Sequence, residues 1–518
     1  MGSSVAMAGA WEAETWGAMI DAKPVRGHLQ PGARESSIGR VDRPFRPDRR
    51  APDLIRDAGP WLEPPHVTRM RARARDFAAR VLEPRALAID EQAGRPHPIG
   101  SADWEVLRAA AREGFLTCMA PRALGGDAAR SAEVAAASEE LARACGGLAL
   151  LIGVSSLGLS ALLFSLDVGL WVRVVRPAAR ERLEARERPT LFAWAITEPS
   201  SGSDVEHPEG LGRVVAPTWA ERVTGGYLLH GRKSFTSNGS IARWIVVHAA
   251  LDRARPRESW TAFLVDTQRP GFRAVRDELK LGQRASPATE TEFDGAFVPE
   301  LDRIGPEGSG FELTELILAA SRAPVGAIAT GIARGALEAT LAALARLPDA
   351  HPASLRQGWV KDVVAEMTTR VHSSRLTYLD AALGFDAQIA PQGWLETGIG
   401  SAARGLHAAL PERRLKRLTE AGFARFLAKL GRSGKLAAQL ARASSAKVAC
   451  SDAAVWVCDR ACDLVPLEAP ERRLVDKALR DAKLTQIYEG TNQINRLTLA
   501  EIVARTRLPT PRATPASA

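Results

Sequence analysis

The chain has 518 residues, of which 46% are apolar and 25% are charged, and its formal net charge is +9. This composition is that of a folded globular protein and excludes a wholly disordered chain. The length excludes a single compact core, so we expect about two to four domains. Five cysteines, an odd number, argue against a disulfide framework and favour a reducing compartment. Because Arg outnumbers Lys, as in proteins of GC-rich bacteria, we expect a cytoplasmic location.

Residues 1–64 are predicted to form a flexible basic arm. Between 22 and 50 there are eight Lys or Arg side chains against three acidic ones, with several Pro and Gly residues. No apolar segment follows a charged one at the N-terminus, so no secretory signal is recognised. No nucleic-acid-binding module accompanies the arm, and we expect no nucleic-acid partner.

Residues 65–189 are predicted to form an α-helical domain, because apolar residues recur at three- and four-residue spacing. Within it, the segment 145–166 carries no charge and is long enough to span a bilayer. Its Gly and Ser content, and the charged helical segment before it, favour a buried core helix over a membrane span.

Residues 190–303 are predicted to form a small β-domain, a barrel or a sandwich. Short runs rich in β-branched and aromatic residues alternate there with turn signals, and Gly225-Gly226 predicts a hairpin. The helical spacing returns over 304–505, and 506–518 is a tail. Helices, then strands, then helices, without βαβ alternation, predict an α+β fold and disfavour a doubly wound one.

A basic insertion is expected at about 385–442. Its part from 404 to 442 holds ten Lys or Arg side chains and two acidic ones, and its apolar residues fall at helical spacing. Such a helix could make peripheral contact with an anionic membrane. The alternative, which we favour, is a basic-faced helix packed on its own protein or on a partner.

Three polar turns are the candidate binding elements, since the chain lacks dinucleotide-binding, P-loop and serine-hydrolase motifs. AITEPSSGSDV (195–205) and GRKSFTSNG (231–239) present hydroxyls that could bind a phosphate or a flavin edge, although Ser-rich turns are common. The third is EGTNQ (489–493). Cys458 and Cys462 are four residues apart with no nearby His, so no metal site is expected.

Five segments in this order resemble the signature segments of the acyl-CoA dehydrogenase family. They are AITEPSSGSDV, GRKSFTSNG, RPGFRAVRDELKLGQRAS, FVPELDRIGPEGSGFE and RDAKLTQIYEGTNQINR. The resemblance covers about residues 67–505. It implies an N-terminal α-helical domain, a central β-barrel domain and a C-terminal four-helix bundle, with FAD between barrel and bundle. It also implies oxidation of an acyl-CoA to the trans-2-enoyl-CoA, as in fatty-acid β-oxidation, with an electron-transfer flavoprotein as acceptor and a homodimer or homotetramer as the assembly.

The resemblance assigns Glu489 as the catalytic base. Such a base must be held in a dry pocket against the weakly acidic Cα–H of the thioester, and burial would raise the pKa of its carboxyl. Gly490 would let the backbone approach the substrate, and an amide there could polarise the thioester carbonyl. The implied cofactor-binding residues are Thr197, Ser203, Phe235, Ser237, Thr491 and Gln493. Tyr488 would form a pocket wall and Arg322 the base of the active site, with packing and a surface ion pair as the alternatives.

The chain departs from the family where a neighbouring subunit grips the pyrophosphate and adenine of FAD. Arg346 is followed by Leu-Pro-Asp-Ala instead of leading to Phe-Gly, and 458–473 has no glycine. We favour an active dehydrogenase with a remodelled dimer contact. A non-catalytic or regulatory subunit that pairs with an active partner is the alternative, so a heteromer stays open. A third interpretation keeps the flavin for another reaction, although the retained Glu489 argues against the oxygenases.

Overall fold

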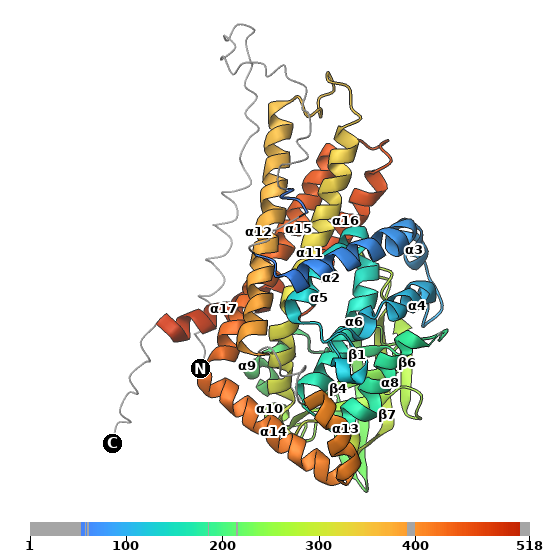
Figure 1. The fold of residues 1–518 in the computed structure, drawn as a ribbon, viewed down its shortest axis with the longest axis vertical. Coiled ribbons are helices and arrows are strands. Elements are labelled where there is room, and N and C mark those ends of the chain that lie inside the picture. Colours follow the sequence, from blue (N-terminus) through green and yellow to red (C-terminus); the bar gives the residue numbers. More distant parts are fainter. Residues whose placement is uncertain are drawn as a thin grey trace, which may run out of the picture. The chain divides into compact units, whose positions relative to one another are not determined.

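The computed structural model describes residues 53–507, with gaps at 57–58, 60–61, 185, 214–215 and 391–398. Most of the predicted basic arm, and the tail from 508, lie outside these residues. The last part of the predicted arm packs onto the helices, since Arg375 donates to the carbonyls of Leu54 and Ile55 at 3.0 and 2.6 Å. Helices, then a sheet, then helices follow one another along the chain (Figure 1), which confirms the predicted α+β fold.

The N-terminal domain is helical. Its α-helices are α2 (Pro65–Phe77), α3 (Ala86–Ala93), α4 (Trp104–Arg112), α5 (Ser131–Ala144), α6 (Gly146–Phe164), α7 (Val168–Leu170) and α8 (Arg176–Arg180), with π-helical turns at Ala78–Leu82 and Trp171–Val175. Asp103 caps α4 by accepting from the Val106 N–H, which is otherwise unpaired at a helix start. Helix α6 is apolar on all sides, and 83% of its most apolar stretch is buried. The predicted buried core helix is therefore confirmed.

The central domain is one sheet of eight strands in the order β6-β7-β3-β2-β4-β5-β8, with β1 paired to β4. The strands are β1 (Phe192–Ala195), β2 (Trp219–Val223), β3 (Gly226–Ser237), β4 (Trp244–Ala250), β5 (Trp260–Asp266), β6 (Phe272–Asp277), β7 (Ala288–Pro299) and β8 (Arg303–Ile304). The predicted hairpin joins β2 and β3. In the described residues β6 and β8 are not paired with each other, so the barrel is open along this seam.

Strands β1 and β2 lie on the same side of β4, one after the other. β1 runs parallel to the first half of β4, from Phe192 beside Trp244, while β2 meets β4 only where Trp219 pairs with Ala250. The connection between β1 and β2 contains the hydroxyl-rich segment 197–203 and the short helix α9 (Pro208–Arg213). The sheet therefore presents this segment at the point where β1 ends.

The C-terminal domain is built on long helices that pack against one another (Figure 1). They are α11 (Gly310–Leu344), α12 (Gly358–Gln388), α15 (Lys435–Leu464), α16 (Arg472–Thr485) and α17 (Asn492–Arg507), with α13 (Ile399–Ala409) and α14 (Glu412–Ser433) between α12 and α15 and a short α10 (Pro256–Ser259) in the sheet domain. α11 also packs against α5. A Cβ at Gly331 would collide with the Glu139 carbonyl, so glycine permits this close approach.

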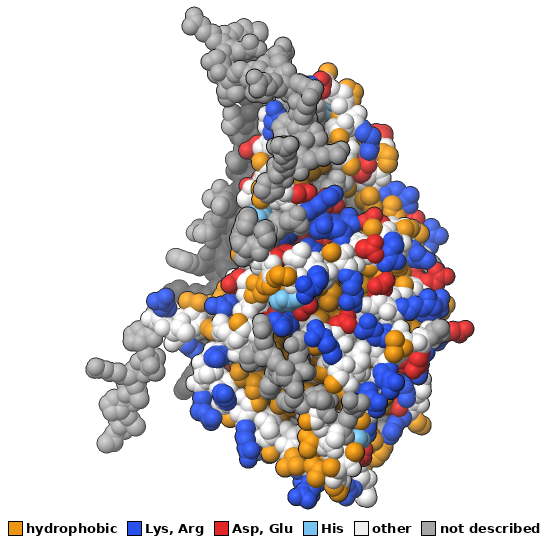
Figure 2. Space-filling view, viewed as in Figure 1, with side chains coloured by type: hydrophobic (Ala, Val, Ile, Leu, Met, Phe, Trp, Pro, Cys, Tyr) orange, Lys and Arg blue, Asp and Glu red, His pale blue; other side chains and the backbone are white. Residues whose placement is uncertain are grey.

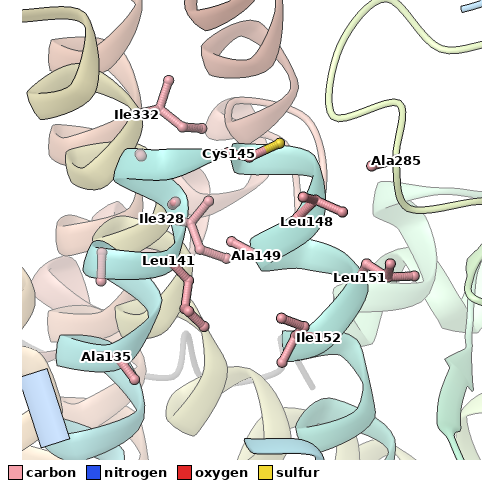
Figure 3. Close-up of a cluster of buried hydrophobic side chains, with 14 of the residues drawn as sticks. Ala135, Leu141, Cys145, Leu148, Ala149, Leu151, Ile152, Ala285, Ile328 and Ile332 are labelled. Carbon is pink, nitrogen blue, oxygen red and sulfur yellow. The ribbon is translucent and has the colours of Figure 1, made fainter. Parts of the chain in front are cut away.

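Apolar packing joins the N-terminal and C-terminal helices into one core. Figure 3 shows Leu141 of α5, Leu148 and Ile152 of α6, and Ile328 and Ile332 of α11 in a single buried cluster. The same cluster continues into the sheet and into α12 and α15. The helical domains are thus covered by each other rather than by separate cores.

A cluster of buried charges lies at the centre of this contact. Glu139 accepts from Arg71 at 2.9 Å and from the Arg375 Nε at 3.0 Å, while Glu140 accepts from Arg334 at 2.8 Å. These side chains are at most 2% exposed. Although burial acts to raise it, the guanidinium groups hold the pKa of Glu139 well below its usual range. The carboxylates therefore stay ionised at neutral pH.

Helix α14 of the predicted insertion packs on its own chain. Leu415, Phe423 and Leu430 are buried in the apolar cluster formed with α7 and the sheet domain. Lys416 is also buried, and its Nζ donates to Asp167 at 2.8 Å. Basic side chains follow α14 along the lower left of the face in Figure 2. Since most of the apolar face is covered by protein, the favoured alternative to membrane contact agrees with the structure.

Candidate functional site

A cavity of about 430 Å³ lies where the sheet, the N-terminal helices and the C-terminal helices meet. One wall comes from the ends of β1 and β3, and another from α5 and α6. The remaining wall comes from α11 and the turn between α16 and α17. Eight of the predicted site residues line this cavity: Thr197, Ser203, Phe235, Ser237, Tyr488, Glu489, Gly490 and Thr491. Segments almost 300 residues apart in the chain therefore meet in one place.

The turn between α16 and α17 has an unusual backbone. Glu489 and Gly490 both have left-handed φ angles, 56° and 79°. For glutamate this conformation is uncommon, and it persists only where the surroundings enforce it. At Gly490 a Cβ would collide with the Glu206 carboxylate, so the position requires glycine.

Three side chains hold this turn through its carbonyl oxygens. The Arg322 Nε donates to the Glu489 carbonyl at 3.1 Å, and the Lys447 Nζ donates to the Gly490 carbonyl at 2.7 Å. The Asn495 Nδ2 donates to the same Gly490 carbonyl at 2.9 Å. These donors come from α11, α15 and α17, so three helices fix the left-handed turn.

Glu489 lines the cavity, and its carboxylate accepts a 2.6 Å hydrogen bond from the Ser321 hydroxyl, which also lines it. Burial raises the pKa of the Glu489 carboxyl to about 7. The Ser321 hydrogen bond acts in the opposite direction, and the neighbouring Glu206 carboxylate adds to the increase. A carboxylate with a pKa near neutrality is a stronger base than an ordinary one and is still substantially ionised at neutral pH.

Three other buried charged residues, Arg322, Lys447 and Glu206, lie next to the turn between α16 and α17. Arg322 is 2% exposed, donates to Glu206 at 3.3 Å and to Ser444 at 2.9 Å, and does not itself line the cavity. It is therefore a buried support and not a surface ion pair. Burial, together with Arg322, lowers the pKa of Lys447 to about 7. Burial also raises the pKa of Glu206.

The sheet side of the cavity carries the hydroxyl groups. Ser203 and Thr491 approach each other with a distance of 3.4 Å between their hydroxyl oxygens, which joins the sheet segment to the turn between α16 and α17. Phe235 is 61% exposed in a left-handed conformation. Trp194 also lines this wall, and its buried indole N–H has no partner among the described residues. Donors beside aromatic surface suit a planar polar ring, so these residues fit the isoalloxazine end of FAD.

Gln493 is the predicted cofactor residue that the structure does not bring to the cavity. It is exposed on α17 and lies at a second, smaller pocket with Lys483 and Arg496. Gln493 therefore lies outside this cavity, and its contact with the cofactor stays a prediction. The Gly490 N–H faces the Glu206 carboxylate in this conformation. Polarisation of the substrate carbonyl by an amide of this turn stays a prediction.

The two segments that depart from the family meet each other in this chain. Arg346, just beyond α11, forms an ion pair with Glu471, just before α16. Glu471 lies within the glycine-free segment 458–473. The altered segments therefore form a contact within the subunit.

Sequence reasoning missed Glu206, Ser321, Lys447 and Asn495. Of these four residues, Lys447 has the clearest signal in the sequence, because it is a single cation in the small-residue run ASSAKVAC. Ser321 directly precedes Arg322 in a helical segment whose other residues are mostly apolar and are expected in the core. Among the described residues, no group of three or more His, Cys, Asp or Glu side chains is placed to hold a metal.

Three family models match consecutive parts of the chain. They describe the N-terminal domain (64–165), the middle domain (193–296) and the C-terminal domain (308–402 and 422–504) of acyl-CoA dehydrogenases. The third model omits residues 403–421, which belong to α13 and the start of α14.

Curated relatives match over nearly their whole length. A cyclohex-1-ene-1-carbonyl-CoA dehydrogenase of Geobacter metallireducens is 32% identical over 82% of this chain and 94% of its own. An acyl-CoA dehydrogenase of Bacillus subtilis is 30% identical over 84% of this chain and 98% of its own. The structure of butyryl-CoA dehydrogenase from Megasphaera elsdenii has the same fold, with a TM-score of 0.63 and 24% identity over 86% of this chain and 99% of that one.

Proposed function

Because this chain belongs to the acyl-CoA dehydrogenase family, a family of oxidoreductases, we propose that it removes the α- and β-hydrogens of an acyl-CoA thioester to form the trans-2-enoyl-CoA. The observation that carries the proposal is the Glu489 carboxylate, which is held in the cavity by a fixed left-handed turn and has a pKa of about 7. In this role Glu489 takes the Cα proton, and the electron pair of that C–H bond forms the new double bond as the β-hydrogen leaves.

Thr197, Ser203, Phe235, Ser237 and Thr491 would hold FAD at the sheet side of the cavity. When bound there, FAD supplies the two-electron acceptor for the β-hydrogen, which leaves as hydride. The chain's own residues have other tasks. Ser321 orients Glu489 and favours its ionised form, while Arg322, Lys447 and Asn495 keep the turn from relaxing.

We further propose an electron-transfer flavoprotein as the acceptor, a cytoplasmic location and a homo-oligomeric assembly. Support comes from the family and from the reducing environment that the cysteines favour. The acceptor is tested by reoxidation of the substrate-reduced protein with a purified electron-transfer flavoprotein.

Replacement of Glu489 by Gln tests the mechanism. The amide keeps the shape of the carboxyl but cannot take the proton, so FAD absorbance should remain and its bleaching by acyl-CoA should be lost. The wild-type protein, mixed anaerobically with acyl-CoAs of increasing chain length and with cyclic ones, should bleach with one class. Bleaching by the Glu489→Gln variant at the wild-type rate would disprove the assignment of the base.

A second candidate, a non-catalytic subunit that pairs with an active relative, is favoured by the contact between Arg346 and Glu471. This contact engages the arginine that would otherwise be free to reach the FAD of a neighbour. The same spectrum decides between the two candidates, because the second predicts a colourless protein that does not retain added FAD.

A further inference from the structure

A second carboxylate, Glu206, lines the cavity beside the proposed base, and the sequence analysis assigned it no role. It ends the short 3-10 turn Ser203–Glu206, which follows the hydroxyl-rich segment of the sheet domain. Its side chain is 9% exposed. A buried carboxylate is costly unless charged or hydrogen-bonding partners compensate it. The groups that contact the Glu206 carboxylate therefore indicate its role.

Glu206 contacts the catalytic turn in two ways. Its Oε2 accepts from the Arg322 Nη2 at 3.3 Å, and the same guanidinium donates through Nε to the Glu489 carbonyl. Its carboxylate also faces the Gly490 N–H, at the place that a Gly490 side chain would occupy. Glu206 thus holds the residue that follows the base and the arginine that holds the base.

The segment that carries Glu206 is itself anchored on both sides. Ser203 approaches Thr491 at 3.4 Å, and His207 contacts Glu501 of α17 at 3.0 Å. Together with the Glu206 contacts, these two contacts join the segment to the turn between α16 and α17 and to α17 itself. A shift of the sheet segment would be transmitted to Glu489 through these contacts.

The charges that face Glu206 come from three elements. Arg322 of α11 and Lys447 of α15 are the cations, and Glu489 of the turn is the anion. The Glu206 charge disfavours the ionised form of Glu489, whereas Arg322 and Lys447 each favour it with a smaller individual effect. Glu206 therefore acts on the base electrostatically as well as by position.

We propose that Glu206 is a positioning residue for the base Glu489, which it holds through Arg322 and the Gly490 amide and whose basicity it strengthens. This inference rests on the proposed dehydrogenase function. Glu206 acts on Glu489 through its charge and through its contacts, and two substitutions remove these effects separately. Glu206→Gln removes the charge but keeps an oxygen that can accept from Arg322 and Gly490, whereas Glu206→Ala removes both charge and contacts.

The test is the pH profile of kcat/KM for the holoenzyme with the acyl-CoA that bleaches the wild type best. Glu489 must be ionised to act, so activity rises with pH through its pKa. Without the Glu206 charge that pKa falls, and the acid limb of Glu206→Gln should move by about one unit to lower pH. Glu206→Ala should show the same movement and, in addition, a fall in kcat on the order of 100-fold as the turn loses its support.

Glu209→Gln is the matched control. Glu209 lies three residues further on in α9, its side chain is 68% exposed, and its partner is Arg213. This variant makes the same change in net charge outside the cavity, and its profile should coincide with that of the wild type. Thermal unfolding and bound FAD are measured for each variant.

The outcomes are distinguishable. A wild-type holoprotein that no acyl-CoA bleaches overturns the proposed function, whatever the variants do. An active wild type whose acid limb coincides with that of Glu206→Gln overturns this inference alone. Failure of both Glu206 variants to fold would make Glu206 a residue of the fold and would also overturn it.

Discussion

The Ser321 hydroxyl and the Glu489 carboxylate form a 2.6 Å hydrogen bond in the wall of the cavity. The bond favours the ionised carboxylate, so it lowers a pKa that burial raises. It also fixes the carboxylate in one direction. Ser321 therefore affects both the ionisation and the orientation of the Glu489 carboxylate.

Replacement of Ser321 by Ala should raise the pKa of Glu489 further above its ordinary value. Since only the ionised form takes the proton, the acid limb of kcat/KM should move to higher pH, by roughly one unit. Activity should fall most below neutral pH and least above pH ~9. Ser373→Ala, on the exposed face of α12, is the control and should leave the profile unchanged. An acid limb that stays in place in Ser321→Ala would show that this hydrogen bond does not tune the base.

Replacement of Gly490 by Ala should distort the turn between α16 and α17 that carries Glu489. The new Cβ would collide with the Glu206 carboxylate, and alanine would have to adopt a left-handed φ of 79°. Together these two effects should lower the stability by about 2 kcal/mol or more. We expect kcat/KM to fall on the order of 100-fold because Glu489 is displaced. Unfolding curves and steady-state rates measure the two effects. Gly422→Ala, in α14 with open space around the added methyl, should be neutral or stabilising.

Replacement of Lys416 by Met should loosen α14. The change leaves Asp167 buried without its cation, which typically destabilises by about 3–5 kcal/mol. Because α14 is rich in Arg and Lys, limited trypsin digestion should cut within 412–433 faster than in the wild type. Lys429→Met, on the exposed side of the same helix, should leave the cleavage rate unchanged. Equal rates for both variants would indicate that the buried ion pair does not hold the helix.

Replacement of Glu139 by Ala should destabilise the whole helical core. Arg71 and Arg375 would lose the carboxylate that they share, and both are almost completely buried. We expect a loss of about 3–5 kcal/mol, measured by urea unfolding. Glu366→Ala removes an exposed pair with Arg370 on α12 and should cost less than about 0.5 kcal/mol. A small loss in Glu139→Ala would mean that water compensates the arginines.

The sequence predicted the order of helices and strands because periodicity and turn residues are local signals. Gly225-Gly226 identified the β2–β3 hairpin, and the uncharged run before Leu166 was correctly assigned to the core. The five motifs also identified Glu489 and the hydroxyl residues that the cavity brings together. Each of these features is encoded within about ten neighbouring residues.

The residues that the sequence did not reveal act across long distances along the chain. Ser321 meets Glu489 across 168 positions, and Arg322 meets Glu206 across 116. No local pattern marks such a pair, and Gln493 shows the converse, since a position inside a motif is exposed outside the cavity. A helix places alternate faces in different surroundings, so a neighbour in sequence is not a neighbour in the site.

The shared core of the helical domains limits how the chain can be divided. Leu141, Ile152 and Ile332 bury one another although they belong to the N-terminal and C-terminal domains, and Gly331 brings α11 against the backbone of α5. A fragment that stops before α11 would expose this apolar surface to water, and so would one that starts there. Truncation or exchange at the junctions near 190 or 304 should therefore yield aggregating pieces rather than independent modules, and two such fragments should recover solubility only when they are produced together.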